Sequence, residues 1–173
     1  GSGKSFCSGY DVTSDMMPDM SEHEHWLKIH AVQRVFEVLA KAPVIRIAQL
    51  HGNVFGGGLL FALQCHLRYA ASNTRFSIPE LDMGTPFIFG GVGQLVRYVG
   101  LTRAADMIIN CRVLLASELG ANSLITEILS SDQLDNTVRQ RAKEIARRPA
   151  ALIIPTINAL QDAEQRLVSD SAD

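Results

Sequence analysis

The 173-residue sequence has no long apolar run, no strong charge imbalance and few cysteines. No stretch approaches the roughly 20 consecutive apolar residues that a membrane-spanning helix needs, and no signal peptide leads the chain, so we expect no membrane partner. The formal net charge is −2, which leaves no basic excess to neutralise phosphates and argues against nucleic acid as the main partner. A soluble cytoplasmic protein is the default expectation.

The cysteines and histidines do not predict a metal site or a disulfide framework. Cys7, Cys65 and Cys111 are widely spaced, odd in number and without a CxxC pair, which favours buried thiols in a reducing compartment. In the run His23–His25, neighbouring side chains on a helix point to different faces and cannot chelate together, so we expect exposed polar residues there. We therefore predict no metal site.

Hydrophobic residues make up 47% of the chain and charged residues 20%, which is ordinary for one globular domain with a real core. Apolar β-branched runs alternate with segments of helical periodicity, and this alternation predicts an α/β fold. We expect a core over residues 1–148 and a C-terminal helical segment over 149–173, divided at a proline. The strands are expected at 5–10, 44–50, from 66 onward, 74–78 and 124–129. The helices are expected at 21–42, 59–64, 94–99, 103–109, 116–121, 135–148 and 150–167.

The stretch His51–Ala70 is the centre of this pattern. Its three consecutive glycines, Gly56 to Gly58, stand between an apolar strand and a helix, where backbone N–H groups suit an oxygen that develops negative charge. Close packing of the helix against a strand, or a tight turn, is the alternative explanation of the glycines. Gly9 marks a second small-residue turn after a strand, and two such turns together are able to form an oxyanion hole.

Glu80 is the main candidate for acid–base chemistry. It follows a strand and a proline, and its apolar sequence neighbours favour a raised pKa, as a general base requires. A capping acid is the alternative, and Asp82 has the same ambiguity. His66 is a weaker acid–base candidate, and Cys65 is expected to be a core thiol. The segment Gly1–Ser5 lacks the spacing and the preceding strand of a phosphate-binding loop.

Five sequence motifs occur in order along the chain. They are FCSGYD, HGNVFGGG, CxLRYA, FSIPELDMG and GGVGQLVRYVG. In these motifs, their order and their separations, the chain resembles the crotonase superfamily, which is the enoyl-CoA hydratase/isomerase family, from residue 3 to about residue 160. The resemblance implies a spiral of ββα units with C-terminal helices, assembled as a homotrimer or a hexamer and acting on acyl-CoA thioesters. It implies no cofactor besides the coenzyme A of the substrate. Family members begin some tens of residues earlier, so we expect a partial chain without the usual N-terminal segment.

The resemblance also implies roles for individual residues. The backbone N–H groups of Tyr10 and Gly57 would form the oxyanion hole for the thioester oxygen, and Glu80 would be the catalytic base. The positions expected to bind substrate are Ser8, Gly9, Gly56, Leu60 and Phe87.

Leu60 differs from the residue that the family's hydratases carry at this position, and the difference affects which reaction we expect. Hydratases of the family hold a water between two glutamates, and Leu60 stands at the first of those positions. A single glutamate is what the family's Δ3,Δ2-enoyl-CoA isomerases carry, so the sequence favours a double-bond shift in fatty acid metabolism. Dienoyl-CoA isomerisation is disfavoured because Leu60 and Ile88 are both apolar. Hydration or decarboxylation through Asp82, Tyr10 or His66 remains an alternative, as does a silent acyl-CoA-binding scaffold.

Overall fold

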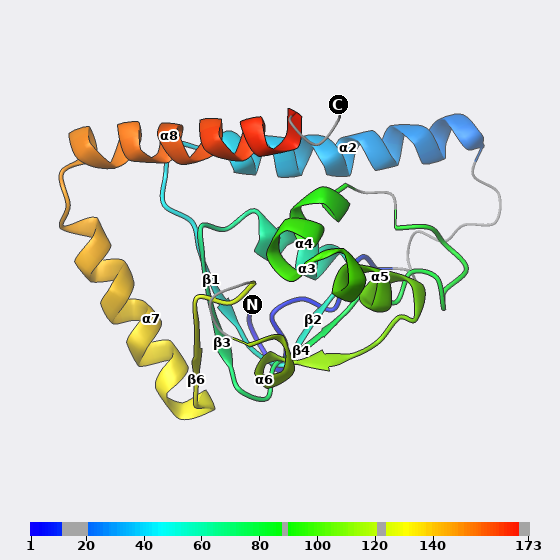
Figure 1. The fold of residues 1–173 in the computed structure, drawn as a ribbon, viewed down its shortest axis with the longest axis horizontal. Helices are drawn as coiled ribbons and strands as arrows, with labels where there is room; N and C mark the ends of the chain where they lie inside the picture. The colour runs from blue at the N-terminus through cyan, green and yellow to red at the C-terminus, as the bar shows by residue number, and fades with distance from the viewer. Residues whose placement is uncertain (12–20, 88–89, 121–123, 170–173) are drawn as a thin grey trace.

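The computed structural model describes residues 1–11, 21–87, 90–120 and 124–169. Among these residues the strands form two three-stranded sheets (Figure 1). In the first, β1 (Ile47–Leu50), β3 (Leu67–Ala71) and β6 (Glu127–Leu129) are all parallel, with β3 in the centre. In the second, β4 (Arg75–Ser77) pairs in parallel with β2 (Asn53–Phe55) and antiparallel with β5 (Leu114–Leu115). Strands and helices alternate along the chain, which confirms the predicted α/β class.

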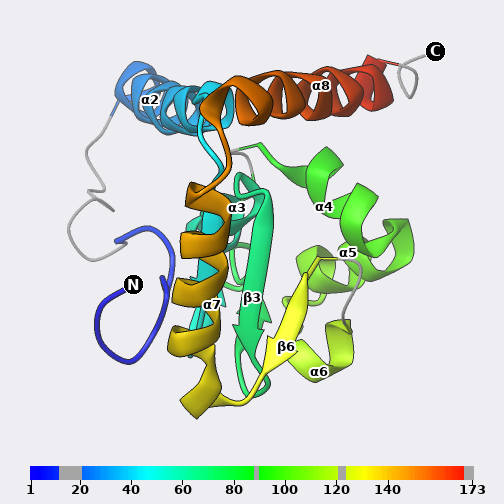
Figure 2. The same cartoon turned by 90° about the vertical axis from the view of Figure 1, so that its left-hand side faces the viewer.

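The helices surround the two sheets. They are α2 (Glu22–Lys41), α3 (Gly57–Leu63), α4 (Val92–Val99), α5 (Leu101–Ile109), α6 (Ala116–Leu119), α7 (Ser131–Ala146) and α8 (Ala150–Ser169). Helix α7 lies against β1 and β3, as Figure 2 shows. Helices α2 and α8 form a separate layer across one end of the molecule in both views, and Gln161 donates a side-chain hydrogen bond to the Ala40 carbonyl at 2.6 Å. Whether the residues after 148 are a separate domain stays a prediction.

Helix α2 begins and ends where the sequence predicts. Ser21 and Glu24 form a reciprocal capping box, in which the Glu24 N–H donates to Ser21 Oγ at 3.3 Å and the Ser21 N–H donates to Glu24 Oε2 at 2.8 Å. The helix ends at Lys41, two residues before Pro43, because the proline cannot continue the hydrogen-bond ladder.

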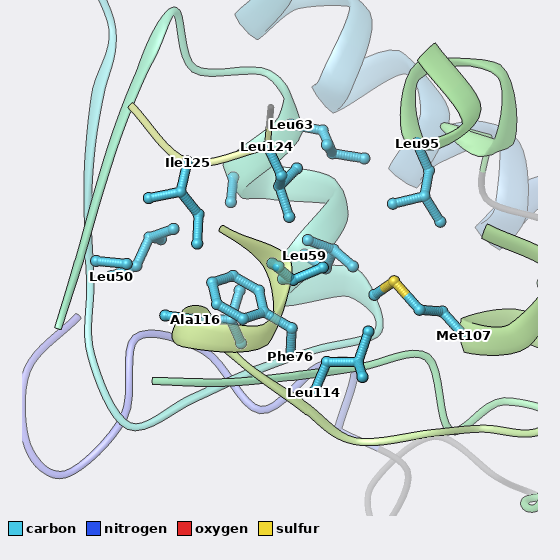
Figure 3. Close-up of a cluster of buried hydrophobic side chains, with 14 of the residues drawn as sticks. Leu50, Leu59, Leu63, Phe76, Leu95, Met107, Leu114, Ala116, Leu124 and Ile125 are labelled. Carbon is cyan, nitrogen blue, oxygen red and sulfur yellow. The ribbon is translucent and has the colours of Figure 1, made fainter. Parts of the chain in front are cut away.

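The main hydrophobic core lies between α3 and the two sheets (Figure 3). Leu50, Leu59 and Phe76 are fully buried, and each such side chain contributes about 1.5–3 kcal/mol through burial. Val54 and Phe76 are paired in the β2–β4 register, so the core fixes the strand ends that follow them by one residue. Further members of this cluster include Leu63, Leu95, Met107, Leu114, Ala116, Leu124 and Ile125.

Four predicted strands are shorter in the structure, and one of them, 74–78, loses only one residue at each end as β4. The run 44–50 is a strand only over Ile47–Leu50, and the run 124–129 only over Glu127–Leu129. Leu124 and Ile125 precede that strand and are buried in the core. The predicted strand 5–10 is reduced to a single bridge between Cys7 and Val54. Strands β2 and β5 were not predicted, and residues 12–20, expected to be a surface loop or lid, lie outside the described residues.

Candidate active site

Three parallel chain segments end side by side at the candidate site. The segment around Cys7 runs along β2, since the Phe55 N–H donates to the Cys7 carbonyl at 3.0 Å and the Cys7 N–H to the Asn53 carbonyl at 3.2 Å. On the other side of β2, the Gly56 N–H donates to the Ser77 carbonyl at the end of β4 at 2.9 Å. Residues 8–10, 56–58 and 78–80 therefore emerge at the same edge, where ligands gather in α/β proteins.

The three consecutive glycines face three different neighbours. An alanine Cβ at position 56 would lie 2.5 Å from Oε1 of Glu80, and one at position 57 would lie 3.7 Å from the backbone nitrogen of Tyr10. At position 58 a Cβ would collide with the carbonyl group of Cys7. Close packing thus explains Gly58, whereas Gly56 and Gly57 adjoin the groups that are expected to act on a ligand.

The backbone of Tyr10 lies beside Gly57, the first residue of α3. Gly9 turns the chain with a φ of +110°, and a Cβ on it would lie 3.9 Å from the Gly57 nitrogen. Tyr10 as a whole is 41% exposed, and the atom of Tyr10 nearest to a Cβ on Gly57 is its backbone nitrogen. The structure therefore brings the two predicted oxyanion-hole residues together; their role stays a prediction.

Glu80 is buried, and the described residues give its carboxylate no ion-pair partner. The residue is 8% exposed, and its Oε2 atom has no hydrogen-bond partner among the described residues. Burial raises the pKa of the Glu80 carboxyl, and a hydrogen bond from its own backbone only partly opposes this shift. A carboxylate that is both buried and unpartnered at one oxygen is suited to accepting a proton from a bound molecule.

The remaining predicted substrate-binding residues have different surroundings. Leu60 is 1% exposed and packs against Gly91, where its Cδ2 fills the space that a side chain at position 91 would need. Phe87 is half-buried and packs against the main hydrophobic core, while Ser8 is exposed. Ile88, which bears on the dienoyl-CoA interpretation, lies outside the described residues.

The alternative candidates are placed as structural or surface groups. Asp82 is exposed. The half-buried His66 accepts the Arg46 N–H at 3.1 Å, and the Arg46 side chain donates to the carbonyls of Gln64 at 2.6 Å and Ala42 at 3.0 Å, which ties the start of β1 to the turn before β3. Cys65 is a buried thiol, as predicted, and its pKa is raised by desolvation.

Within the described parts of the chain, no group of three or more His, Cys, Asp and Glu side chains is placed to hold a metal ion. A search of the same residues for a helix long and apolar enough to cross a membrane also finds none.

Two contacts were not predicted from the sequence. They are Gly56 with Glu80 and Leu60 with Gly91. Neither was evident from a local pattern, because each contact joins residues that are far apart in the chain.

A match to the family described as "Enoyl-CoA hydratase/isomerase" extends over residues 1–170. The chain belongs to the enoyl-CoA hydratase/isomerase family. Human mitochondrial methylglutaconyl-CoA hydratase is 30% identical over 172 residues, covering 96% of this chain and 50% of that protein. Short-chain-enoyl-CoA hydratase of Clostridium acetobutylicum is 34% identical over 144 residues, covering 82% of this chain and 54% of that protein. The chain thus spans about half the length of these curated relatives of the family.

The crystal structure of an enoyl-CoA hydratase from Bacillus anthracis shares the fold of this family member. It superposes with a TM-score of 0.86 at 24% identity and covers 95% of this chain and 64% of its own. At that identity the likeness establishes the fold alone. Together with the family match, it confirms the predicted crotonase fold.

Proposed function

We propose that this chain carries the acid–base site of an acyl-CoA enzyme that shifts the double bond of an enoyl-CoA, with Glu80 as the single proton carrier. The observation that carries the proposal is the Glu80 carboxylate itself, which is buried, unpartnered at Oε2 among the described residues, and next to the glycine run that adjoins Tyr10. Family membership supports an acyl-CoA thioester as the substrate.

The reaction needs only one base and a site for an oxyanion. The Glu80 carboxylate takes a proton from C2 of a 3-enoyl-CoA, and the electrons of the C–H bond move into a dienolate with its negative charge on the thioester oxygen. The adjoining Tyr10 and Gly57 backbones supply the N–H dipoles for that oxygen. The same carboxyl then returns the proton to C4, which gives the 2-enoyl-CoA. Atoms and electrons balance without a cofactor besides the coenzyme A of the substrate.

Leu60 supports isomerisation over hydration. Adding water across the double bond requires a group that orients the water opposite the base. Leu60 has no polar atom in its side chain, is fully buried and is held against Gly91. A leucine in this packed position cannot accept a hydrogen bond, so Glu80 would act without a second carboxylate from this helix.

Hydration is the second candidate, because two of the similar relatives are named as hydratases, of methylglutaconyl-CoA and of short-chain enoyl-CoA. Hydration by this chain would need catalytic residues other than a pair of glutamates at positions 60 and 80, because position 60 is a leucine. Loss of chemistry with retained acyl-CoA binding would instead mark the chain as a scaffold.

Separate incubation with a 3-enoyl-CoA and a 2-enoyl-CoA tests these alternatives, with products resolved by chromatography and absorbance of the conjugated thioester. We expect interconversion of the two isomers, and a loss of about 10²–10⁴-fold in kcat for Glu80→Gln. Asp82→Asn is the matched control, since Asp82 is a nearby but exposed acid, and it should keep the wild-type rate. Formation of 3-hydroxyacyl-CoA instead would establish hydration, and binding without turnover would overturn both enzymatic proposals.

Assembly and location are further parts of the proposal. Helices α2 and α8 expose large apolar side chains that a second copy of the chain is able to cover. These include Val35, Val38, Leu152 and Leu160. We propose a homotrimer or a hexamer in the cytoplasm, and light scattering of the purified protein at several concentrations tests the assembly. A monomer at all concentrations would contradict it.

A further inference from the structure

Gly56 is held in place from two directions. Its N–H donates to the Ser77 carbonyl at 2.9 Å, and its carbonyl accepts the N–H groups of Leu59 at 2.9 Å and Leu60 at 3.1 Å. Its dihedral angles, φ 48° and ψ −118°, belong to a region that residues with a side chain rarely adopt. Because the peptide groups on both sides are bonded to β4 and α3, the direction in which a Cβ would point is fixed.

That direction leads to the Glu80 carboxylate. An alanine Cβ at position 56 would lie 2.5 Å from Oε1, 3.3 Å from Cδ and 3.6 Å from Oε2 of Glu80. The first of these distances is shorter than any normal carbon–oxygen contact, so the carboxylate and a Cβ cannot both occupy their places. Glu80 is buried, which limits where the displaced carboxylate is able to go.

The contact also distinguishes the two carboxylate oxygens. Oε1 is the atom nearest to the position of the missing Cβ, whereas Oε2 is more than an ångström farther from it. Oε2 is the buried oxygen without a hydrogen-bond partner among the described residues. One oxygen thus lies against the glycine backbone, and the other is left without a hydrogen-bond partner among the described residues.

We propose that Gly56 is a positioning residue for Glu80: its bare Cα is the surface against which Oε1 rests, and this leaves Oε2 as the oxygen that takes and returns the proton. The first half of this inference concerns packing alone. The second half rests on the isomerisation proposed above.

A double-mutant cycle tests the packing. It compares the melting temperature, Tm, of the wild type, Gly56→Ala, Glu80→Ala and the double variant. Gly56→Ala should lower Tm more when Glu80 is present than when residue 80 is alanine, by roughly 2 °C or more, because truncating the carboxylate makes room for the Cβ. The conformational penalty of a side chain at this φ occurs in both backgrounds and cancels.

Gly120→Ala is the matched control for that penalty. Gly120 also has dihedral angles that favour glycine, φ 75° and ψ 159°, but a Cβ there would meet no atom of the described residues within 4 Å. Its effect on Tm should be the same in the wild type and in the Glu80→Ala background. If Gly56→Ala and Glu80→Ala are additive in Tm, the inference is wrong, whatever the chain catalyses. If Gly56→Ala alone fails to fold, recovery of folding in the double variant supports the inference, and failure of both contradicts it.

The kinetic readout tests the second half. Gly56→Ala should lower kcat for isomerisation by about 10-fold or more while KM stays within about 3-fold, since the displaced group is the base and not a binding surface. An unchanged kcat together with a coupled Tm would keep Gly56 as a packing residue only and overturn its role in proton transfer. Absence of isomerase activity in the wild type would overturn the proposed function, while the Tm cycle would still decide the packing inference.

Discussion

Two sites in this molecule place acidic side chains in opposite surroundings. At the start of α5, a hollow of about 640 Å³ is lined by charged residues that include Asp106, Arg112 and Glu118. There Arg112 lies 3.2 Å from Asp106 Oδ2 and 3.6 Å from Glu118 Oε1, and Glu118 also accepts the Leu115 N–H at 2.8 Å. Glu80, in contrast, is buried and lacks a partner for Oε2 among the described residues.

The pKa shifts follow these surroundings. The pKa of Asp106 is lowered, chiefly by the hydrogen bond from the Asn110 side chain and further by the positive charge of Arg112. The pKa of Glu80 is raised by burial. The charged groups that line the hollow form ion pairs and hydrogen bonds with one another, cap α6 and join it to α5. Their role in the fold explains why they are there. A carboxylate that the fold leaves uncompensated is the better candidate for chemistry.

The largest expected effect is on the pH dependence of the rate. Because the base must be ionised to take a proton, kcat/KM for isomerisation should fall about tenfold per pH unit below the pKa of Glu80 and level off above it. Since burial raises that pKa, the inflection should lie above the ordinary value for a glutamate. Asp106→Asn should leave the profile unchanged. An inflection at or below the ordinary glutamate value would remove the contrast between the two sites.

A smaller effect is expected on stability. A carboxyl whose pKa is raised on folding stabilises the protein fully below its unfolded-state pKa, and this contribution is lost as pH rises through the raised folded-state pKa. Glu80→Gln should therefore be more stable than the wild type near pH 8, by on the order of 1 kcal/mol, and should lose this advantage near pH 4. Urea unfolding at both pH values measures the difference. An advantage of equal size at both would show that ionisation is not its cause.

The smallest effect is expected at Asp106. Its lowered pKa means that the ionised form contributes stability above the unfolded-state pKa and that this is lost as pH falls through the folded-state pKa. Asp106→Asn should lower Tm slightly at neutral pH and low salt. The difference should disappear in about 1 M NaCl, where the Debye length is about 3 Å and exposed ion pairs are screened. A salt-independent loss would indicate that the Asn110 hydrogen bond dominates.

The sequence was sufficient to predict what depends on neighbours in the chain. The capping box of Ser21 and Glu24, the end of α2 before Pro43 and the placement of Glu80 just after a strand all follow from local rules, and the structure agrees with them. The association of Tyr10 with Gly57 was expected from the family resemblance, and the structure places the two backbones side by side. Their assignment as an oxyanion hole came from the family resemblance.

The parts that were missed depend on residues far apart in the sequence. Strand β2 has three residues and β5 only two, and both are strands only because they pair with β4. No local pattern of that length distinguishes a strand from a loop. The same holds for the contact of Leu60 with Gly91 and of Gly56 with Glu80, which arise when α3 packs against segments that follow it.

The glycine run between β2 and α3 also sets the length of that connection. Gly56 precedes α3 with non-helical dihedral angles, and Gly57 and Gly58 are the first residues of that helix, so the three glycines face their neighbours in a fixed order. A single insertion or deletion would present each glycine to its neighbour's partner. The glycine now beside the Glu80 carboxylate would face the Tyr10 backbone, and a residue with a side chain would enter one of the three contacts. Length variation among natural or engineered forms of this protein should therefore be confined to other loops, and this turn should serve as a fixed reference point for aligning them.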